Sequence, residues 1–185
     1  MSSLKPFRKL HADTRIDHGI FTLHHERYES PRNADVQDAV IIAPPDWVNI
    51  VAFTDAGECV MIRQYRFGTE DFAIEIPGGM IDPGESPLIA AQRELREETG
   101  FTSQRWSSLG RVAPNPAYQR NYLYTFLAEG CTREGDQRQD PGEDIEILVT
   151  PRSELDQLLA NGGIDHALVV VAFHKLELLR RTQQR

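Results

Sequence analysis

Short apolar runs separated by turn residues dominate the chain between residues 20 and 76. Runs of this length, bounded by glycine, proline or aspartate, are typical of buried strands. On this pattern we expect strands at residues 20–28, 39–43, 48–54, 58–65 and 72–76. We expect the turns at residues 30–33, 44–45, 55–57 and 77–79, where proline, glycine and asparagine gather.

A helix is predicted over residues 87–99. Ser86 is a good N-cap, and the proline that follows it suits the first helical position. Gly100 can end the helix in a left-handed conformation. Leu88, Ala91 and Leu95 share one face at helical spacing and are expected to pack inward.

The second half of the chain alternates strands and helices without a regular repeat. Strands are expected near residues 105–112, 121–129 and 145–149, and helices at residues 153–160 and 166–180. Residues 132–144 are polar and rich in turn formers, which predicts a mobile surface loop or a lid. This order of elements favours a mixed sheet covered by helices.

Composition places the chain among ordinary folded proteins. Its 185 residues are 40% hydrophobic and 26% charged, enough for one domain with its own core. The two cysteines form neither a disulfide framework nor a zinc motif, so a reducing cytoplasm is the simplest setting. The first 25 residues lack the apolar stretch of a signal peptide, and no run is long enough to span a membrane.

Net charge narrows the choice of partners. With 28 acidic and 20 basic residues the chain has a net charge of −8. This charge argues against a protein that binds nucleic acid over its whole surface. A phosphorylated substrate would also be repelled unless local arginines or metal ions reversed the field.

Three glutamates gather on the predicted helix. Glu94 lies three residues before Glu97 and four before Glu98, so all three carboxylates are expected on one side, opposite the leucine face. Clustered hard oxygen ligands suit Mg²⁺ or Mn²⁺. Arg93, four residues before Glu97, can hold that carboxylate in place.

A charged helix segment is, by itself, typical of a solvated face. Here the acidic segment belongs to a longer pattern: Gly79, then Glu85, then the stretch from Arg93 to Phe101 that holds the three glutamates and Gly100. The pattern fixes nine positions and resembles the Nudix box at each of them. Only Phe101 departs mildly, since this position is more often aliphatic. The chain therefore resembles a Nudix hydrolase.

The resemblance implies an α/β/α sandwich around a mixed sheet, and Mg²⁺- or Mn²⁺-dependent hydrolysis of a nucleoside diphosphate linked to another group. It implies that the metal is held by Glu94 and Glu98, by Glu97 directly or through water, and by the carbonyl oxygen of Gly78. Arg93 would orient these glutamates and Glu85 would be structural. A substrate could approach closely at Gly79.

Segments outside the box resemble the branch of ADP-ribose pyrophosphatases and nucleotide-sugar hydrolases. They are the stretches at residues 46–49, 63–66 and 75–79, and Pro116. This implies cleavage of ADP-ribose or a related nucleoside diphosphate sugar into a nucleoside monophosphate and a sugar phosphate. It also implies a homodimer, with residues 1–42 as a β-strand segment for dimerisation and base binding and residues 43–185 as the Nudix domain. GDP-mannose is the nearest alternative substrate, a non-catalytic nucleotide sensor is an alternative of another class, and RNA decapping is disfavoured.

Residues outside the box are further candidates for substrate chemistry. Glu143, in an acidic segment that resembles one supplying a catalytic glutamate in this branch, is expected to act as base or metal ligand, with Glu146 as the alternative. Arg66 is favoured over Arg63 for the substrate phosphates, and the two should face opposite sides of a strand. A pairing of Arg66 with acidic residues is the competing interpretation. Tyr28 is the first candidate to stack on the base; Trp47 is more easily explained as core or dimer contact.

Overall fold

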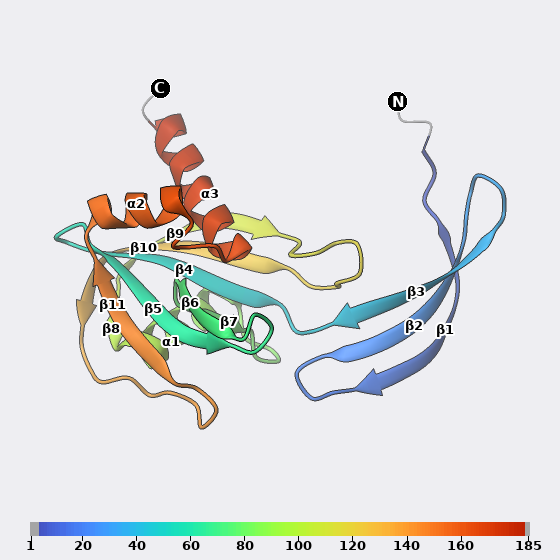
Figure 1. Cartoon of the computed structure of the whole chain (residues 1–185), viewed down its shortest axis with the longest axis horizontal. Coiled ribbons are helices and arrows are strands. Elements are labelled where there is room, and N and C mark those ends of the chain that lie inside the picture. The colour runs from blue at the N-terminus through green and yellow to red at the C-terminus, as the bar shows by residue number, and fades with distance from the viewer. Residues whose placement is uncertain (1–3, 184–185) are drawn as a thin grey trace. The chain divides into compact units, whose positions relative to one another are not determined.

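A computed structural model describes residues 4–183 and divides the chain into two compact units (Figure 1). The first holds the residues up to Asp46 together with Ala113–Tyr122, and the second holds Trp47–Val112 and the residues from Leu123 onward. No helix in the described part of the chain is long and apolar enough to cross a membrane.

The first unit is an antiparallel sheet in the order β1-β2-β3. Its strands are β1 (Arg8–Asp17), β2 (Thr22–Glu29) and β3 (Val36–Ala43). The sequence pattern missed β1, because its residues are largely exposed and charged and show no apolar run. The loop at Ala113–Tyr122 joins this unit through hydrogen bonds between Ile42 and both Tyr118 and Arg120, each 2.8 Å long.

A buried carboxylate ties the loop to this sheet. Glu26 is 1% exposed and accepts hydrogen bonds from Arg120 at 2.8 and 3.1 Å, from Lys9 at 2.6 Å and from the Tyr28 hydroxyl at 2.6 Å. The bonds from Arg120, and then those from Lys9 and Tyr28, lower the pKa of Glu26 to about 2 although burial opposes the shift. Two cations thus stabilise the ionised form of one buried acid.

The second unit is built on a mixed sheet in the order β11-β5-β4-β10-β8. Three more strands extend it, since β6 pairs with β5, β7 with β4 and β9 with β10. The strands are β4 (Trp47–Thr54), β5 (Cys59–Arg66), β6 (Asp71–Glu75), β7 (Gly78–Met80), β8 (Phe101–Thr102), β9 (Arg105–Val112), β10 (Leu123–Arg133) and β11 (Ile145–Thr150). β4 and β10 run parallel and their other pairings are antiparallel, which confirms the expected mixed sheet.

Helices cover both faces of this sheet (Figure 1). They are α1 (Pro87–Thr99), α2 (Arg152–Asn161) and α3 (Ala167–Gln183). Between α1 and the sheet lies one core, which includes Val60 and Leu95; between the sheet and α2 and α3 lies another, which includes Met61 and Leu155. Neighbouring residues of β5 thus point into different cores, as strand alternation requires, and the α/β/α sandwich is confirmed.

The N-cap and C-cap predicted for α1 are confirmed. Ser86 accepts a hydrogen bond from the N–H of Ile89, and Gly100 is left-handed with φ of 70°. The predicted inward face of the helix was partly wrong: Leu95 is buried, but Leu88 is 37% exposed.

Two segment boundaries also differ from those expected. Residues 132 and 133 continue β10, so the polar loop begins at residue 134 rather than 132. Gly78–Met80 is a short strand rather than a turn, because its backbone pairs with β4.

Candidate active site

Glycines of β7 allow α1 to lie close to the sheet. The N–H of Gly78 donates a hydrogen bond of 2.8 Å to Oε2 of Glu98. A Cβ placed on Gly79 would overlap the carboxylate of Glu94. The lack of a side chain at Gly79 therefore lets the backbone of β7 lie against Glu94, whereas the lack of one at Gly78 lets β7 lie close to the backbone of β4.

Glu94 and Glu98 are buried, at 8% and 2% exposed, beside the leucine core of α1. They were expected on the side opposite Leu95, and this was wrong: both lie on the buried part of the helix surface. Only Glu97 is partly exposed, with 42% of its side chain accessible. Glu94 and Glu98 therefore do not belong to a solvated helix face.

Burial strongly perturbs these two acids. It raises the pKa of Glu94 to about 7, even though the nearby Arg93 opposes the shift. It raises the pKa of Glu98 well above its ordinary value, against the hydrogen bond from Gly78, and the charge of Glu94 adds to the rise. Buried carboxylates with too few cations around them are typical of functional sites.

Arg93 connects the acids of the box. Its guanidinium lies 3.0 Å from Glu85, 2.8 Å from Glu94 and 3.2 Å from Glu97, and donates to the carbonyl oxygen of Met80 at 3.0 Å. The contact with Glu97 is the one that the spacing of four residues predicts. Arg93 thus fixes the carboxylates from outside, while Glu85 holds Arg93 itself.

The donor set suits a hard divalent cation, because buried carboxylates gain most from a positive charge beside them. Within the described residues, however, no three side chains of His, Cys, Asp or Glu are arranged to hold a metal. One oxygen of Glu94 and one of Glu97 accept hydrogen bonds from Arg93, and one oxygen of Glu98 accepts from the N–H of Gly78. A carboxylate has two oxygens, so each of these side chains could ligate a metal and keep its present hydrogen bond.

Glu143 lies near the box glutamates. Its charge contributes to the raised pKa values of Glu94, Glu98 and Arg66. Its carboxylate accepts a hydrogen bond of 3.0 Å from the N–H of Asp140, which holds it within its own loop. A role for Glu143 at the reacting phosphate stays a prediction.

The alternative glutamate of this region is placed differently. Glu146 stands opposite Arg63 across β11 and β5, and their side chains form an ion pair of 3.6 Å. Met61 lies on the same strand face as Arg63, and Leu148 on the same face as Glu146. Both pack into the core beneath α2 and α3, whereas the box glutamates lie on the α1 side of the sheet. The register therefore favours Glu143.

The loop that carries Glu143 is anchored to the end of α1. The N–H of Arg138 donates a hydrogen bond of 2.7 Å to the backbone carbonyl oxygen of Glu97. The side-chain amide of Gln137 donates one of 2.6 Å to the backbone carbonyl oxygen of Glu98. Sequence reasoning missed Gln137, because a glutamine in a polar loop carries no distinguishing signal. The segment expected to be a mobile loop or a lid is thus bound at its base to α1, the helix of the box glutamates.

Arg66 makes a two-pronged ion pair with Glu75. The two bonds measure 2.6 and 2.7 Å, and Glu75 is 4% exposed. This pairing raises the pKa of Arg66. Arg66 therefore has the acidic partner that the competing interpretation required, yet it also lies within the field of Glu98 and Glu143. His166, 3.7 Å from Glu75, extends the group and was missed, since the histidines show no motif in the sequence.

The two candidate aromatic residues belong to different units. Tyr28 lies in the first, where its hydroxyl donates to Glu26 and its pKa is raised by that contact. Trp47 begins β4 in the second unit, is half-buried and stands opposite Met80 of β7. A base-stacking role for Tyr28 stays a prediction.

Comparison with known proteins supplies independent findings. Residues 44–172 match the NUDIX domain. An ADP-ribose pyrophosphatase of Bacillus subtilis (strain 168) is 28% identical over 165 residues, 89% of each chain. An ADP-ribose pyrophosphatase of Mycobacterium tuberculosis (strain ATCC 25618 / H37Rv) is 31% identical over 166 residues, 89% of this chain and 80% of the relative. A crystal structure of an ADP compounds hydrolase aligns with a TM-score of 0.85 and 26% identity, covering 99% of this chain and 98% of that one.

The matched segment contains β7, α1 and the loop of Glu143, so it covers the residues that the fold brings together around Glu94 and Glu98. It also spans more than half of the chain. The chain therefore belongs to the NUDIX family.

Proposed function

We propose that this chain hydrolyses the pyrophosphate bond of ADP-ribose or a related nucleoside diphosphate sugar, releasing a nucleoside monophosphate and a sugar phosphate. The observation that carries the proposal is the pair of buried carboxylates, Glu94 and Glu98, held against a glycine strand within a NUDIX domain. The relatives named ADP-ribose pyrophosphatase, and the similar structure of an ADP compounds hydrolase, support the substrate class.

Nudix hydrolases in general depend on a divalent metal ion, and we propose Mg²⁺ or Mn²⁺ for this chain. Glu94, Glu98, Glu97 and the carbonyl oxygen of Gly78 would hold the ion. When bound, such an ion neutralises charge on the pyrophosphate oxygens and makes a coordinated water more acidic. Arg93 is the positioning residue that keeps the carboxylates in place.

The remaining steps fall to side chains near the glutamates. Glu143 would accept the proton of the water that attacks phosphorus, because its carboxylate lies within the field of Glu94 and Glu98. Arg66 would bind a phosphate oxygen with part of its guanidinium while Glu75 keeps that guanidinium oriented. At Gly79 the substrate would approach the backbone beside the carboxylate of Glu94, which occupies the space that a side chain at this position would fill. Tyr28 would stack on the base.

Turnover on a panel of substrates tests the proposal. Purified protein with Mg²⁺ is incubated with ADP-ribose, GDP-mannose, UDP-glucose, diadenosine polyphosphates, NADH and 8-oxo-dGTP, and products are separated by chromatography. We expect fastest cleavage of ADP-ribose or another nucleotide sugar, abolished by EDTA. Nucleotide binding without any turnover would overturn the proposal in favour of a non-catalytic sensor.

We further propose a homodimer formed through the first unit. Its strand β3 carries two exposed apolar side chains on one face, Val36 at 45% and Val40 at 47% exposure. The mass in solution is measured by light scattering for Val40→Asp and for the matched control Val149→Asp, a strand valine of the second unit at 43% exposure. A dimer lost only in Val40→Asp supports this surface, and a monomeric parent protein contradicts it.

We also propose a cytoplasmic location, which the free and buried thiols of Cys59 and Cys131 support.

A further inference from the structure

A cavity of about 470 Å³ lies on the outward surface of α1, within the size range of small-molecule sites. Its helix residues follow the spacing of one helical face. The lining residues are Ile89, Gln92, Arg93, Arg96, Glu97, Thr102, Ser103, Gln104, Trp106 and Arg138. Apart from Arg93 and Glu97, none of these belongs to the pyrophosphate site described above.

The lining is cationic in an acidic protein. The charged lining residues are three arginines and one glutamate, whereas the whole chain has a net charge of −8. Arg93 is neutralised by the box glutamates, but Arg96 and Arg138 have no ion-pair partner among the residues that the structure describes. Two exposed guanidinium groups without carboxylates are suited to a phosphate, which they can bind through paired hydrogen bonds.

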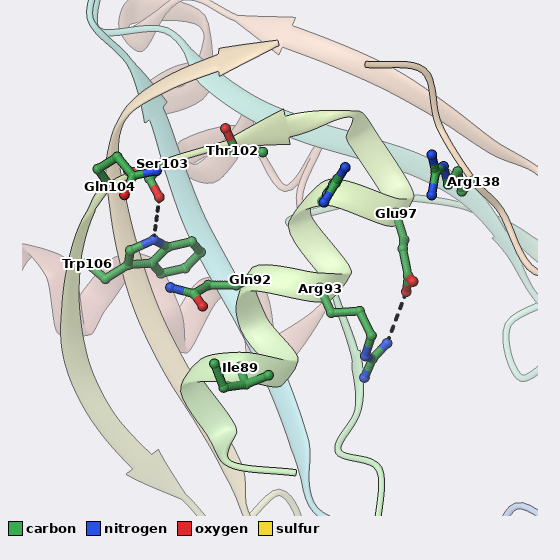
Figure 2. A pocket seen from close by; sticks show the side chains of 10 residues that line it. Ile89, Gln92, Arg93, Glu97, Thr102, Ser103, Gln104, Trp106 and Arg138 are labelled. Carbon is green, nitrogen blue, oxygen red and sulfur yellow. Dashed lines mark hydrogen bonds and ion pairs between the residues drawn. The ribbon is translucent and has the colours of Figure 1, made fainter. Parts of the chain in front are cut away.

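The other part of the cavity offers a flat aromatic surface. The indole N–H of Trp106 donates to the carbonyl oxygen of Ser103 at 2.9 Å, which fixes the orientation of the ring. Figure 2 shows Trp106 with Gln92 and Ile89 at one end of the labelled group, and Glu97, Arg93 and Arg138 at the other. An aromatic ring beside amide side chains suits a nucleobase, which can stack and also form hydrogen bonds.

We propose that this cavity is a second nucleotide-binding site, distinct from the pyrophosphate site, with the phosphate on Arg96 and Arg138 and the base against Trp106. Its arrangement matches the two ends of a nucleoside monophosphate, an anion and a ring. Because Arg93 and Glu97 line both sites, a nucleotide bound here would adjoin the carboxylates of the box.

Calorimetric titration of the full chain with AMP in EDTA tests the site without any turnover. We expect binding that weakens at least tenfold in the double variant Arg96→Ala/Arg138→Ala and several-fold in Trp106→Leu. The matched control, Arg152→Ala/Arg181→Ala, removes the same charge from α2 and α3. Its affinity for AMP should equal that of the parent protein. Circular dichroism melts establish that each variant is folded.

Three further titrations distinguish this cavity from the pyrophosphate site and from a site for a base or an anion alone. Arg66→Ala should leave AMP binding in EDTA unchanged; binding lost in Arg66→Ala but kept in Arg96→Ala/Arg138→Ala would place AMP in the pyrophosphate site and overturn the proposal. Adenosine and inorganic phosphate should each bind at least tenfold more weakly than AMP. Either of them binding as tightly as AMP, or no AMP binding up to millimolar concentration, would also overturn it.

Discussion

The backbone N–H of Gly78 donates a hydrogen bond of 2.8 Å to the carboxylate of Glu98, which is only 2% exposed. A glutamine at position 98 could still accept this bond, but it would carry no charge for a metal. Because burial already disfavours the ionised form, Glu98→Gln should melt at or above the temperature of the parent protein in EDTA. Turnover of ADP-ribose with Mg²⁺ should fall at least about 100-fold.

The control for Glu98→Gln is Glu154→Gln, an exposed acid in the first turn of α2, which should keep full turnover. If Glu98→Gln turned over at the rate of this control, Glu98 would have no part in the reaction.

The two glycines of β7 should respond differently to alanine. A Cβ on Gly79 overlaps the end of the flexible Glu94 side chain, which can move away at little cost to stability. A Cβ on Gly78 overlaps the backbone of Val48 and Asn49, which cannot. Gly79→Ala should therefore lower kcat at least about tenfold with a nearly unchanged melting temperature. Gly78→Ala should lower the melting temperature itself.

Gly68→Ala is the control for both changes, since a Cβ there meets no atom within 4 Å and its backbone is not left-handed. Steady-state kinetics and thermal melts of all three variants give the comparison. Equal melting temperatures for the Gly78 and Gly79 variants would contradict the distinction between backbone and side-chain overlap.

Much of the site could be predicted from the sequence because its residues lie close together along the chain. The box fits on one strand, one turn and one helix, and helical spacing alone brings Arg93 to Glu97. What failed was the direction in which the helix faces the sheet. Leu88 has the apolar character of a core residue, but the small Gly79 leaves space that Glu94 fills instead. That choice depends on tertiary packing, which spacing does not encode.

Contacts between residues distant in sequence could not be predicted from the hydrophobic pattern for the same reason. Strand β1 was missed because a charged strand at the edge of an exposed sheet lacks the alternation that identifies one. In the hairpin of β5 and β6, Arg66 stands opposite Asp71, and Glu75 stands opposite Ile62. The side chain of Arg66 nevertheless pairs with Glu75 rather than with its cross-strand neighbour. Sequence alone suggests an arginine for phosphate, and only the side-chain contacts show which acid orients it.

Arg66 and Arg63 form a matched pair on opposite faces of β5. Arg66 lies with Glu75 in the field of Glu98, whereas Arg63 pairs with Glu146 on the other side. We expect Arg66→Ala to lower kcat/KM for ADP-ribose at least about tenfold, through loss of a charged hydrogen bond to phosphate. Arg63→Ala should change it less than about threefold, since exposed ion pairs contribute little. An unchanged kcat/KM in Arg66→Ala would remove Arg66 from substrate binding.

Glu143 and Glu146 form a second matched pair. If Glu143 is the base, Glu143→Gln should lower kcat by about 100-fold or more and leave KM nearly unchanged. Glu146→Gln should lose only the ion pair with Arg63 and keep its activity. Single-turnover rates over a range of pH distinguish loss of a base from loss of binding. Full activity in Glu143→Gln would exclude it, and a defect confined to Glu146→Gln would reverse the assignment.

Glu26 should make the first unit sensitive to acid. Its pKa falls from 4.5 to about 2 on folding because Arg120, Lys9 and Tyr28 bond to the ionised carboxylate. A depressed pKa stabilises the fold above pH 4.5, and this contribution disappears as the pH falls from 4.5 through about 2. Because Lys9 and Arg120 remain about half exposed to solvent, we expect on the order of 2 kcal/mol rather than the full value of the shift.

Urea unfolding of Glu26→Gln and the parent protein between pH 2.5 and 7 measures this contribution. The variant should be less stable at pH 7, and the difference should shrink steadily below pH 4.5, because protonation makes the parent resemble the glutamine. Glu29→Gln, which loses only an exposed pair with Arg8, is the control and should follow the parent at every pH. A constant difference between Glu26→Gln and the parent would mean that the glutamine acts through packing, and that the charge of Glu26 contributes nothing to the acid sensitivity of this unit.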